Sequence, residues 1–99
     1  MYLISYDIEG DNLRTKISDK LIAEGLQRIQ YSVFLGKVAP QDILTLEQWL
    51  LQALQKGNPQ KDTILIIHLT EPQVKAMKIL GFDKYDKDLL IDKKSTLIL

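Results

Sequence analysis

Three carboxylates lie close together near the start of the chain, at Asp7, Glu9 and Asp11. Magnesium prefers oxygen ligands and retains several waters, so one or two carboxylates can hold the ion beside a phosphate. The chain has no cysteine and one histidine, which excludes thiol proteases, zinc ribbons and histidine-rich metal sites. Because acidic residues that follow a strand also serve as helix caps, the segment alone leaves a metal site and a structural role open.

Basic residues can bind nucleic acid here only through a local arrangement. Thirteen Lys and Arg residues balance thirteen Asp and Glu residues, which excludes bulk attraction to a polyanion. Arg14, Lys16 and Lys20 lie off the apolar stripe of the helix expected after residue 10, so they face solvent or a ligand. No Ser/His/Asp set, P-loop or dinucleotide-binding motif is present. We interpret His68, which lies in an apolar segment, as a structural residue.

The first expected element is the strand that must position Asp7. Residues 2–8 (YLISYDI) are rich in aromatic and β-branched side chains, which predicts a strand. Because side chains alternate between the two faces of a strand, Asp7 is expected to point away from the core at the carboxyl end. The face that enters the core carries Tyr2, Ile4, Tyr6 and Ile8.

A helix is expected next, capped by Asp11 or Asn12, and Gly25 is suited to end it in a left-handed conformation. Residues 28–38 (RIQYSVFLGKV) are typical of β-structure but exceed the usual strand length. A hairpin that reverses near Tyr31 and Ser32 and one long bent strand both fit, and we favour the hairpin. In the hairpin, Gly36 would mark a bulge or a close backbone approach.

The second half of the chain predicts another helix and another strand. Pro40 begins a segment with apolar residues at helical spacing, and Trp49 lies at the margin of that stripe. Residues 63–69 (TILIIHL) are apolar on both faces, which is typical of a strand covered on both sides. Because helices cover only one face of such a sheet, we expect a second subunit to cover the other. Residues 70–73 begin a turn or short helix, and residues 77–82 fit either its continuation or a fifth strand.

This order of elements predicts an α+β fold, a ferredoxin-like βαββαβ arrangement with an extra C-terminal strand. The length and the 45% hydrophobic content predict one domain over residues 1–99. The tail, residues 83–99, is charged and then closes on the apolar residues 96–99 (TLIL). Since such a strand needs a sheet edge, we expect the tail to pair with the partner subunit of a homodimer. Neither a membrane span nor a signal peptide is expected, and the lack of cysteine suits a cytoplasmic location.

Three segments of the chain together resemble a known family. They are Tyr6-Asp7-Ile8, Asp11-Asn12-Leu13-Arg14 and residues 25–34 (GLQRIQYSVF). This combination resembles the CRISPR-associated endonuclease family of spacer acquisition, the smaller of the two proteins shared by most CRISPR adaptation systems. The resemblance is strongest over residues 1–38 and follows the element order through the tail.

The resemblance implies a ferredoxin-like homodimer whose sheets face each other, with the C-terminal strand added to the partner's sheet. It also implies a scaffold for the CRISPR integrase, which inserts new spacers into the repeat array. Several members of the family are magnesium-dependent nucleases on single-stranded RNA or duplex DNA, and in others cleavage is absent or dispensable. The expected cofactor is therefore Mg²⁺, and the expected partners are a second copy, the integrase and nucleic acid.

Six residues match functional positions of the family. The expected catalytic residues are Asp7, Tyr6 and Phe34, and the expected nucleic-acid-binding residues are Arg14, Lys16 and Arg28. Asp7 matches the metal-binding aspartate. Lys16 stands where arginine is often found, which retains the charge but loses the planar bidentate fork. Leu35 replaces an acidic residue of some members, so the substrate preference stays open.

The implied mechanism is phosphodiester hydrolysis across a twofold axis. Paired Asp7 carboxylates would bind magnesium, and Arg14, Lys16 and Arg28 would position the nucleic-acid backbone. Two other interpretations stay open at this point. One is a catalytically silent scaffold that grips duplex DNA between integrase subunits, and the other is a stand-alone toxin-like ribonuclease of the same fold.

Overall fold

A four-stranded antiparallel sheet organises residues 1–81, the part of the chain that the computed structural model describes. The elements are β1 (Tyr2–Asp7), α1 (Asp11–Ala23), β2 (Gln27–Gln30), β3 (Val33–Gly36), α2 (Pro40–Leu54), β4 (Thr63–His68) and α3 (Glu71–Ala76). The strand order is β2-β3-β1-β4, so β1 lies inside the sheet and β4 at an edge. The predicted ferredoxin-like α+β arrangement is confirmed. The predicted tail over residues 83–99, with its extra strand and its pairing, lies outside the described residues.

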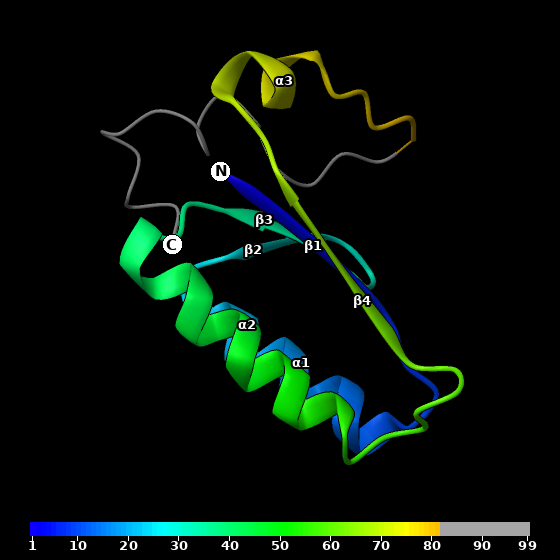
Figure 1. Cartoon of the computed structure of the whole chain (residues 1–99). Helices are drawn as coiled ribbons and strands as arrows, with labels where there is room; N and C mark the ends of the chain where they lie inside the picture. Colours follow the sequence, from blue (N-terminus) through cyan, green and yellow to red (C-terminus); the bar gives the residue numbers. More distant parts are fainter. Residues whose placement is uncertain (82–99) are drawn as a thin grey trace.

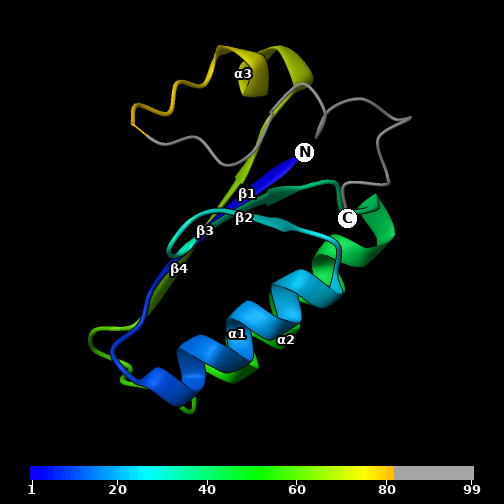
Figure 2. The ribbon, with the colours of Figure 1, turned by 180° about the vertical axis from the view of Figure 1, so that it is seen from behind.

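Helices α1 and α2 lie side by side on one face of the sheet (Figures 1 and 2). The predicted alternation of β1 is confirmed, because Ile4, Tyr6 and Ile8 are buried against these helices and Asp7 is exposed. Burial of this face on the apolar stripes of two helices is what holds β1 in place. The helical residues buried in this core are Ile17, Leu21, Ile43, Leu46, Leu50 and Ala53.

The hairpin prediction for the second β-rich segment is also confirmed. The chain reverses at Tyr31 and Ser32, between β2 and β3. The pairing of the two strands has a bulge between Arg28 and Gln30. Immediately before β3, the Ser32 carbonyl accepts a 3.1 Å hydrogen bond from the Tyr6 N–H, which ties the turn to the carboxyl half of β1.

The second face of the sheet is only partly covered in one chain. Helix α3 packs on this face, where Val74 and Leu35 are fully buried. Farther along β4, Leu65 is 56% exposed and Ile67 is 37% exposed. Helix α3 does not reach along the length of β4, so cover of this face by a second subunit stays a prediction.

Two local predictions are corrected at the ends of helices. Gly10, and not Asp11 or Asn12, occupies the N-cap position of α1, and no side chain caps this helix. Residues 77–81 are neither helix nor strand, because α3 ends at Ala76 and the next residue has an extended backbone. The short helix predicted after residue 70 is confirmed, and it begins with a capping box formed by Thr70 and Gln73.

None of the helices within residues 1–81 is long and apolar enough to cross a membrane. The cytoplasmic location stays a prediction.

Gly25 ends α1 with a φ of +94°, in the left-handed conformation that its sequence position predicted.

Substitution of Gly36 by alanine should destabilise the fold by about 1–3 kcal/mol, because the added Cβ overpacks a close backbone approach. That atom would lie 2.9 Å from the Leu26 Cα and 3.2 Å from the Gly25 carbonyl oxygen. Urea unfolding monitored by the fluorescence of Trp49 measures the change. The control is Gly10→Ser, because a Cβ at Gly10 meets nothing within 4 Å and its hydroxyl can cap α1. Equal stability of Gly36→Ala and wild type would contradict the close approach.

Candidate functional site

Asp7 is the last residue of β1 and lies on the face of the sheet opposite to α1 and α2. It pairs with Thr63 of β4 in the ladder, and its side chain is exposed. Within the described part of the chain, its carboxylate forms no ion pair and accepts no hydrogen bond. The Asp7 carboxylate is therefore accessible to solvent, and its oxygens are available to bind a metal ion.

The neighbouring carboxylates are each engaged by a partner. Glu9 lies 3.5 Å from the Lys61 ammonium, and Asp11 forms an ion pair with Arg14. The predicted group of Asp7, Glu9 and Asp11 therefore does not converge on one point. Among residues 1–81 no group of three or more His, Cys, Asp and Glu side chains could hold a metal ion. A metal site built from this segment of one chain has to rest on Asp7.

Arg14 braces the connection between β1 and α1. Its Nη1 donates hydrogen bonds of 3.0 Å to the carbonyls of Ile8 and Glu9, and its Nη2 pairs with Asp11. The side chain is 27% exposed. The predicted role of Arg14 in contacting nucleic acid stays a prediction, and the contacts observed here fix the loop that follows Asp7.

A stack of three side chains lies behind the carboxyl end of β1. The Arg28 guanidinium carbon lies 5.1 Å from the centroid of the Phe34 ring, and the Phe34 and Tyr6 rings stack with centroids 6.0 Å apart. Arg28 also donates a 2.6 Å hydrogen bond from Nη2 to the Ser18 hydroxyl of α1, while its Nε has no partner in the described chain.

Phe34 is fully buried, and Tyr6 is nearly so. A side chain with no accessible surface cannot touch a substrate, so these two rings support the backbone at Asp7. The predicted catalytic role of Tyr6 and Phe34 stays a prediction, and their burial favours a positioning role over contact with a substrate.

Lys16 and Lys20 lie on the flank of α1 that faces α2. Their ammonium groups are 5.7 and 5.3 Å from the centroid of the Trp49 ring, a geometry that attracts a cation to the face of an indole. Trp49 is half-buried, as predicted for the margin of the core. Lys16 remains exposed, so its charge is accessible to a phosphate.

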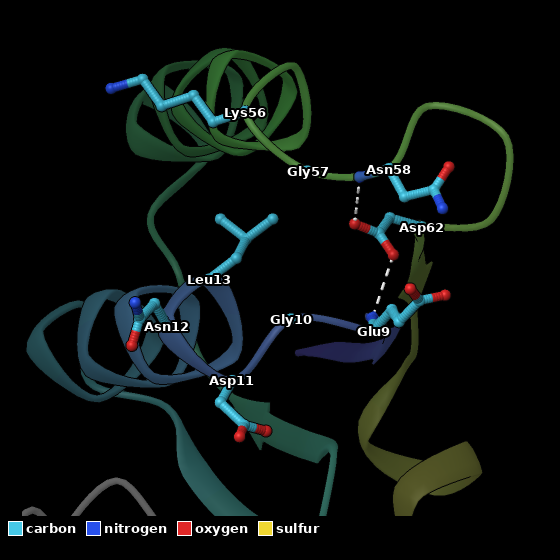
Figure 3. Close-up of a pocket in the computed structure, with 9 residues that line it drawn as sticks. All are labelled: Glu9, Gly10, Asp11, Asn12, Leu13, Lys56, Gly57, Asn58 and Asp62. Atoms are coloured by element: carbon cyan, nitrogen blue, oxygen red, sulfur yellow. Dashed lines mark hydrogen bonds between the residues drawn. The ribbon is translucent and has the colours of Figure 1, made fainter.

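Sequence reasoning missed a cleft that borders the first residues of α1. The cleft has a volume of about 550 Å³ and lies between the loop after β1 and the loop between α2 and β4 (Figure 3). Its lining residues are Glu9, Gly10, Asp11, Asn12, Leu13, Lys56, Gly57, Asn58 and Asp62. The turn composition of Asn58 and Pro59 was the available signal, but it could not show which distant loop the turn would meet.

Asp62 joins the two loops that border the cleft. Its carboxylate accepts a 3.0 Å hydrogen bond from the Glu9 N–H and a 2.7 Å hydrogen bond from the Asn58 N–H (Figure 3). These two backbone donors, Glu9 first, hold the pKa of the Asp62 carboxyl below its ordinary value. The carboxylate therefore serves to fix the end of β1.

The donor set near Asp7 fits a sparse magnesium site. One accessible carboxylate is enough for this ion when phosphate oxygens and water complete its coordination. Within residues 1–81, Asp7 is the carboxylate at this strand end that has no partner, so this part of the chain offers a single protein ligand.

A family model and the sequences of known proteins point to the same family. The family model described as "CRISPR associated protein Cas2" matches residues 1–77. A CRISPR-associated endoribonuclease Cas2 of Francisella tularensis subsp. novicida is 43% identical over 82 residues, which cover 83% of this chain and 80% of that protein. A Cas2 endoribonuclease of Pyrobaculum aerophilum is 41% identical over 59 residues, which cover 59% of this chain and 65% of that protein. The chain thus spans just under two thirds of that relative.

Two further similarities concern architecture. A protein of Thermoproteus tenax named "CRISPR-associated endonuclease Cas1/endonuclease Cas2 fusion" is 39% identical over 59 residues, which cover 59% of this chain and 22% of the fusion. The crystal structure of Streptococcus pyogenes Cas2 superposes with a TM-score of 0.70 and 24% identity, covering 81% of this chain and 98% of that one. The similarity to the Streptococcus pyogenes structure shows that this chain has the same fold.

The Asp62→Asn variant should have a lower Tm than wild type at neutral pH, with a difference that shrinks in acid. Because the folded-state pKa of Asp62 is lowered, its contribution is present above the unfolded value of about 3.9 and is lost as the pH falls through the folded value. Thermal melts between pH 7 and about pH 3 measure this. Asp19→Asn, on the exposed face of α1, is the control and should show no such convergence. A constant difference across this range would contradict the role of Asp62.

Proposed function

The chain belongs to the CRISPR-associated protein Cas2 family, and on that premise we propose that it is a homodimeric, magnesium-dependent endonuclease that also serves as a scaffold for the CRISPR integrase during spacer acquisition. The observation that carries the nuclease proposal is the state of Asp7. Within residues 1–81 its carboxylate has no partner, although the acidic residues around it, Glu9, Asp11 and Asp62, are each bound.

The names of the relatives support the same activity. The proteins of Francisella and Pyrobaculum are both named endoribonucleases, which supports RNA phosphodiester hydrolysis as the reaction of this chain. The fusion of Cas1 and Cas2 in Thermoproteus supports a Cas1-type integrase as its partner, because fused proteins must be able to work at close range.

Asp7, Arg14 and Lys16 have different roles at this proposed site. Asp7 would hold magnesium, which when bound supplies a water activated for attack and stabilises charge on the scissile phosphate. Arg14 fixes the loop after Asp7 through the carbonyls of Ile8 and Glu9. Lys16, exposed on α1, would attract the phosphate backbone of the substrate.

A second copy of the chain has two roles in this proposal. It would bring a second Asp7 to the substrate, and it would cover the open face of the sheet. Exposed Leu65 and Ile67 lie on the same face as Asp7, because alternate residues of paired strands share one side. Apolar surface on a sheet face favours association with another protein surface.

The contacts of the arginines favour a scaffold without cleavage as a second candidate. Arg14 and Arg28 are both committed to contacts within the chain, so two of the three basic residues expected to position a substrate are already engaged. In this case the protein would grip DNA between integrase subunits, and Asp7 would have no catalytic role.

The Asp7→Asn variant separates the two candidates. The substitution is nearly isosteric and removes only the charge, so we expect magnesium-dependent cleavage to fall by about 100-fold or more while fold and dimer persist. The assay measures cleavage of single-stranded RNA and duplex DNA during a magnesium titration. Asp19→Asn controls for the loss of one negative charge and should cleave as wild type does. Cleavage at the wild-type rate by Asp7→Asn, or no cleavage by wild type, would leave the scaffold as the better account.

The Leu65→Glu variant tests the homodimer. A carboxylate placed in an apolar interface carries a desolvation cost, so the dimer dissociation constant should rise by about 100-fold or more. Sedimentation velocity measures the assembly, and urea unfolding checks that the monomer remains folded. Leu44→Glu is the matched control, since Leu44 is 65% exposed on α2, on the other side of the sheet. If Leu65→Glu sediments as the wild-type dimer does, this face is not the interface.

A further inference from the structure

The turn between β2 and β3 presents an aromatic ring to solvent. Tyr31 is 73% exposed, and among the Phe, Trp and Tyr side chains within residues 1–81 it is the one that is largely exposed. The other aromatic rings of this part of the chain are buried or packed against neighbours, as in the Tyr2–His68 and Tyr6–Phe34 pairs. Packing of the core therefore gives no reason for an aromatic residue at this turn.

The structure holds this turn beside the carboxyl end of β1. Residues 33 to 36 of β3 pair with residues 5 to 2 of β1, and the hydrogen bond from Tyr6 to Ser32 continues that register by one residue. Ser32 therefore lies across from Tyr6, the residue before Asp7, and Tyr31 is the other residue of the reversal, on its β2 side. Figures 1 and 2 both show the turn next to the carboxyl half of β1.

The bulge in β2 adds to this placement. It lies between Arg28 and Gln30, immediately before the turn. Bulges increase local twist and re-aim the side chains that follow, and they are frequent next to active sites. On one side of the bulge, the Arg28 guanidinium is held by Ser18 and by the Phe34 ring, so the base of the hairpin is anchored while its tip is open.

We propose that Tyr31 is a base-stacking residue that receives an unpaired base of single-stranded nucleic acid whose phosphate lies at Asp7. This inference rests on the proposed function and names the substrate class of that site. A phenol ring offers a flat apolar face, and aromatic stacking on splayed bases is the common way in which proteins grip single strands. Bases within a duplex are stacked on one another and are not available to the ring. Tyr31 should therefore not increase the affinity for duplex DNA.

Binding measured in the Asp7→Asn background tests this without requiring cleavage. The probes are a short fluorescein-labelled single-stranded RNA, a single-stranded DNA of the same sequence, and the corresponding DNA duplex, each titrated by fluorescence anisotropy. Tyr31→Ala should weaken single-strand binding by about tenfold, the range expected for loss of one stacked base. Tyr31→Phe keeps the ring and should bind as the Asp7→Asn parent does.

Matched controls separate stacking from general effects. Leu44→Ala removes exposed apolar surface from α2, on the other side of the sheet, and should leave all three affinities unchanged. Parallel losses on RNA and DNA single strands support stacking alone, and a loss confined to RNA supports stacking together with recognition of the 2′-hydroxyl.

Three results would overturn the proposal. They are an equal loss on the duplex, unchanged single-strand binding by Tyr31→Ala, and dissociation of the dimer by Tyr31→Ala in sedimentation, which would make the ring an interface residue. Absence of cleavage by the wild type would overturn the nuclease proposal alone, because the binding measurements do not depend on it.

Discussion

The alternation of side chains along β1 is the constraint on which the rest of the structure depends. One face of the strand supplies Ile4, Tyr6 and Ile8 to the core beneath α1 and α2. Because the period of a strand is two residues, Asp7 must then emerge on the opposite face. A shift of one residue in this strand would bury the carboxylate and expose the core, so fold and site are specified by the same pattern.

The polar contacts around the end of β1 leave one carboxylate unbound. Arg14 closes the loop after the strand from one side, and Asp62 closes it from the other through the Glu9 N–H. Both contacts are charge-assisted hydrogen bonds, which are stronger than bonds between neutral groups, because each uses a charged side chain against backbone partners. The result is a rigid strand end on which an unpaired charge is held in a defined place, which is the arrangement that a catalytic or metal-binding group needs.

The second face of the sheet connects assembly with substrate. It carries Asp7 together with the exposed apolar residues of β4, and the turn of the β2–β3 hairpin is hydrogen-bonded to Tyr6, the residue before Asp7. A homodimer through this face and a single strand beside Tyr31 therefore compete for neighbouring surface. The two proposals are compatible only if the dimer covers the apolar part of β4 and leaves the hairpin tip open.

The amino-acid sequence by itself determined the element order through β4, the core face of β1 and the exposure of Asp7, and it favoured the hairpin at Tyr31 and Ser32 over one long strand. Those features follow from periodicity, turn chemistry and backbone preference, which act between near neighbours. The family resemblance seen in residues 6–34 is likewise confirmed by the match over residues 1–77.

Only the tertiary structure decided which partner each polar side chain finds. Asp62 and Glu9 are fifty-three residues apart in the chain and meet in space, and no local pattern predicts that contact. The same holds for Arg28, which the family resemblance implied to bind nucleic acid and which lies between Ser18 and the buried Phe34 ring. Long-range packing sets the distances over which hydrogen bonds and ion pairs act, so the sequence could place Asp7 on a face but could not show that its neighbours were already engaged.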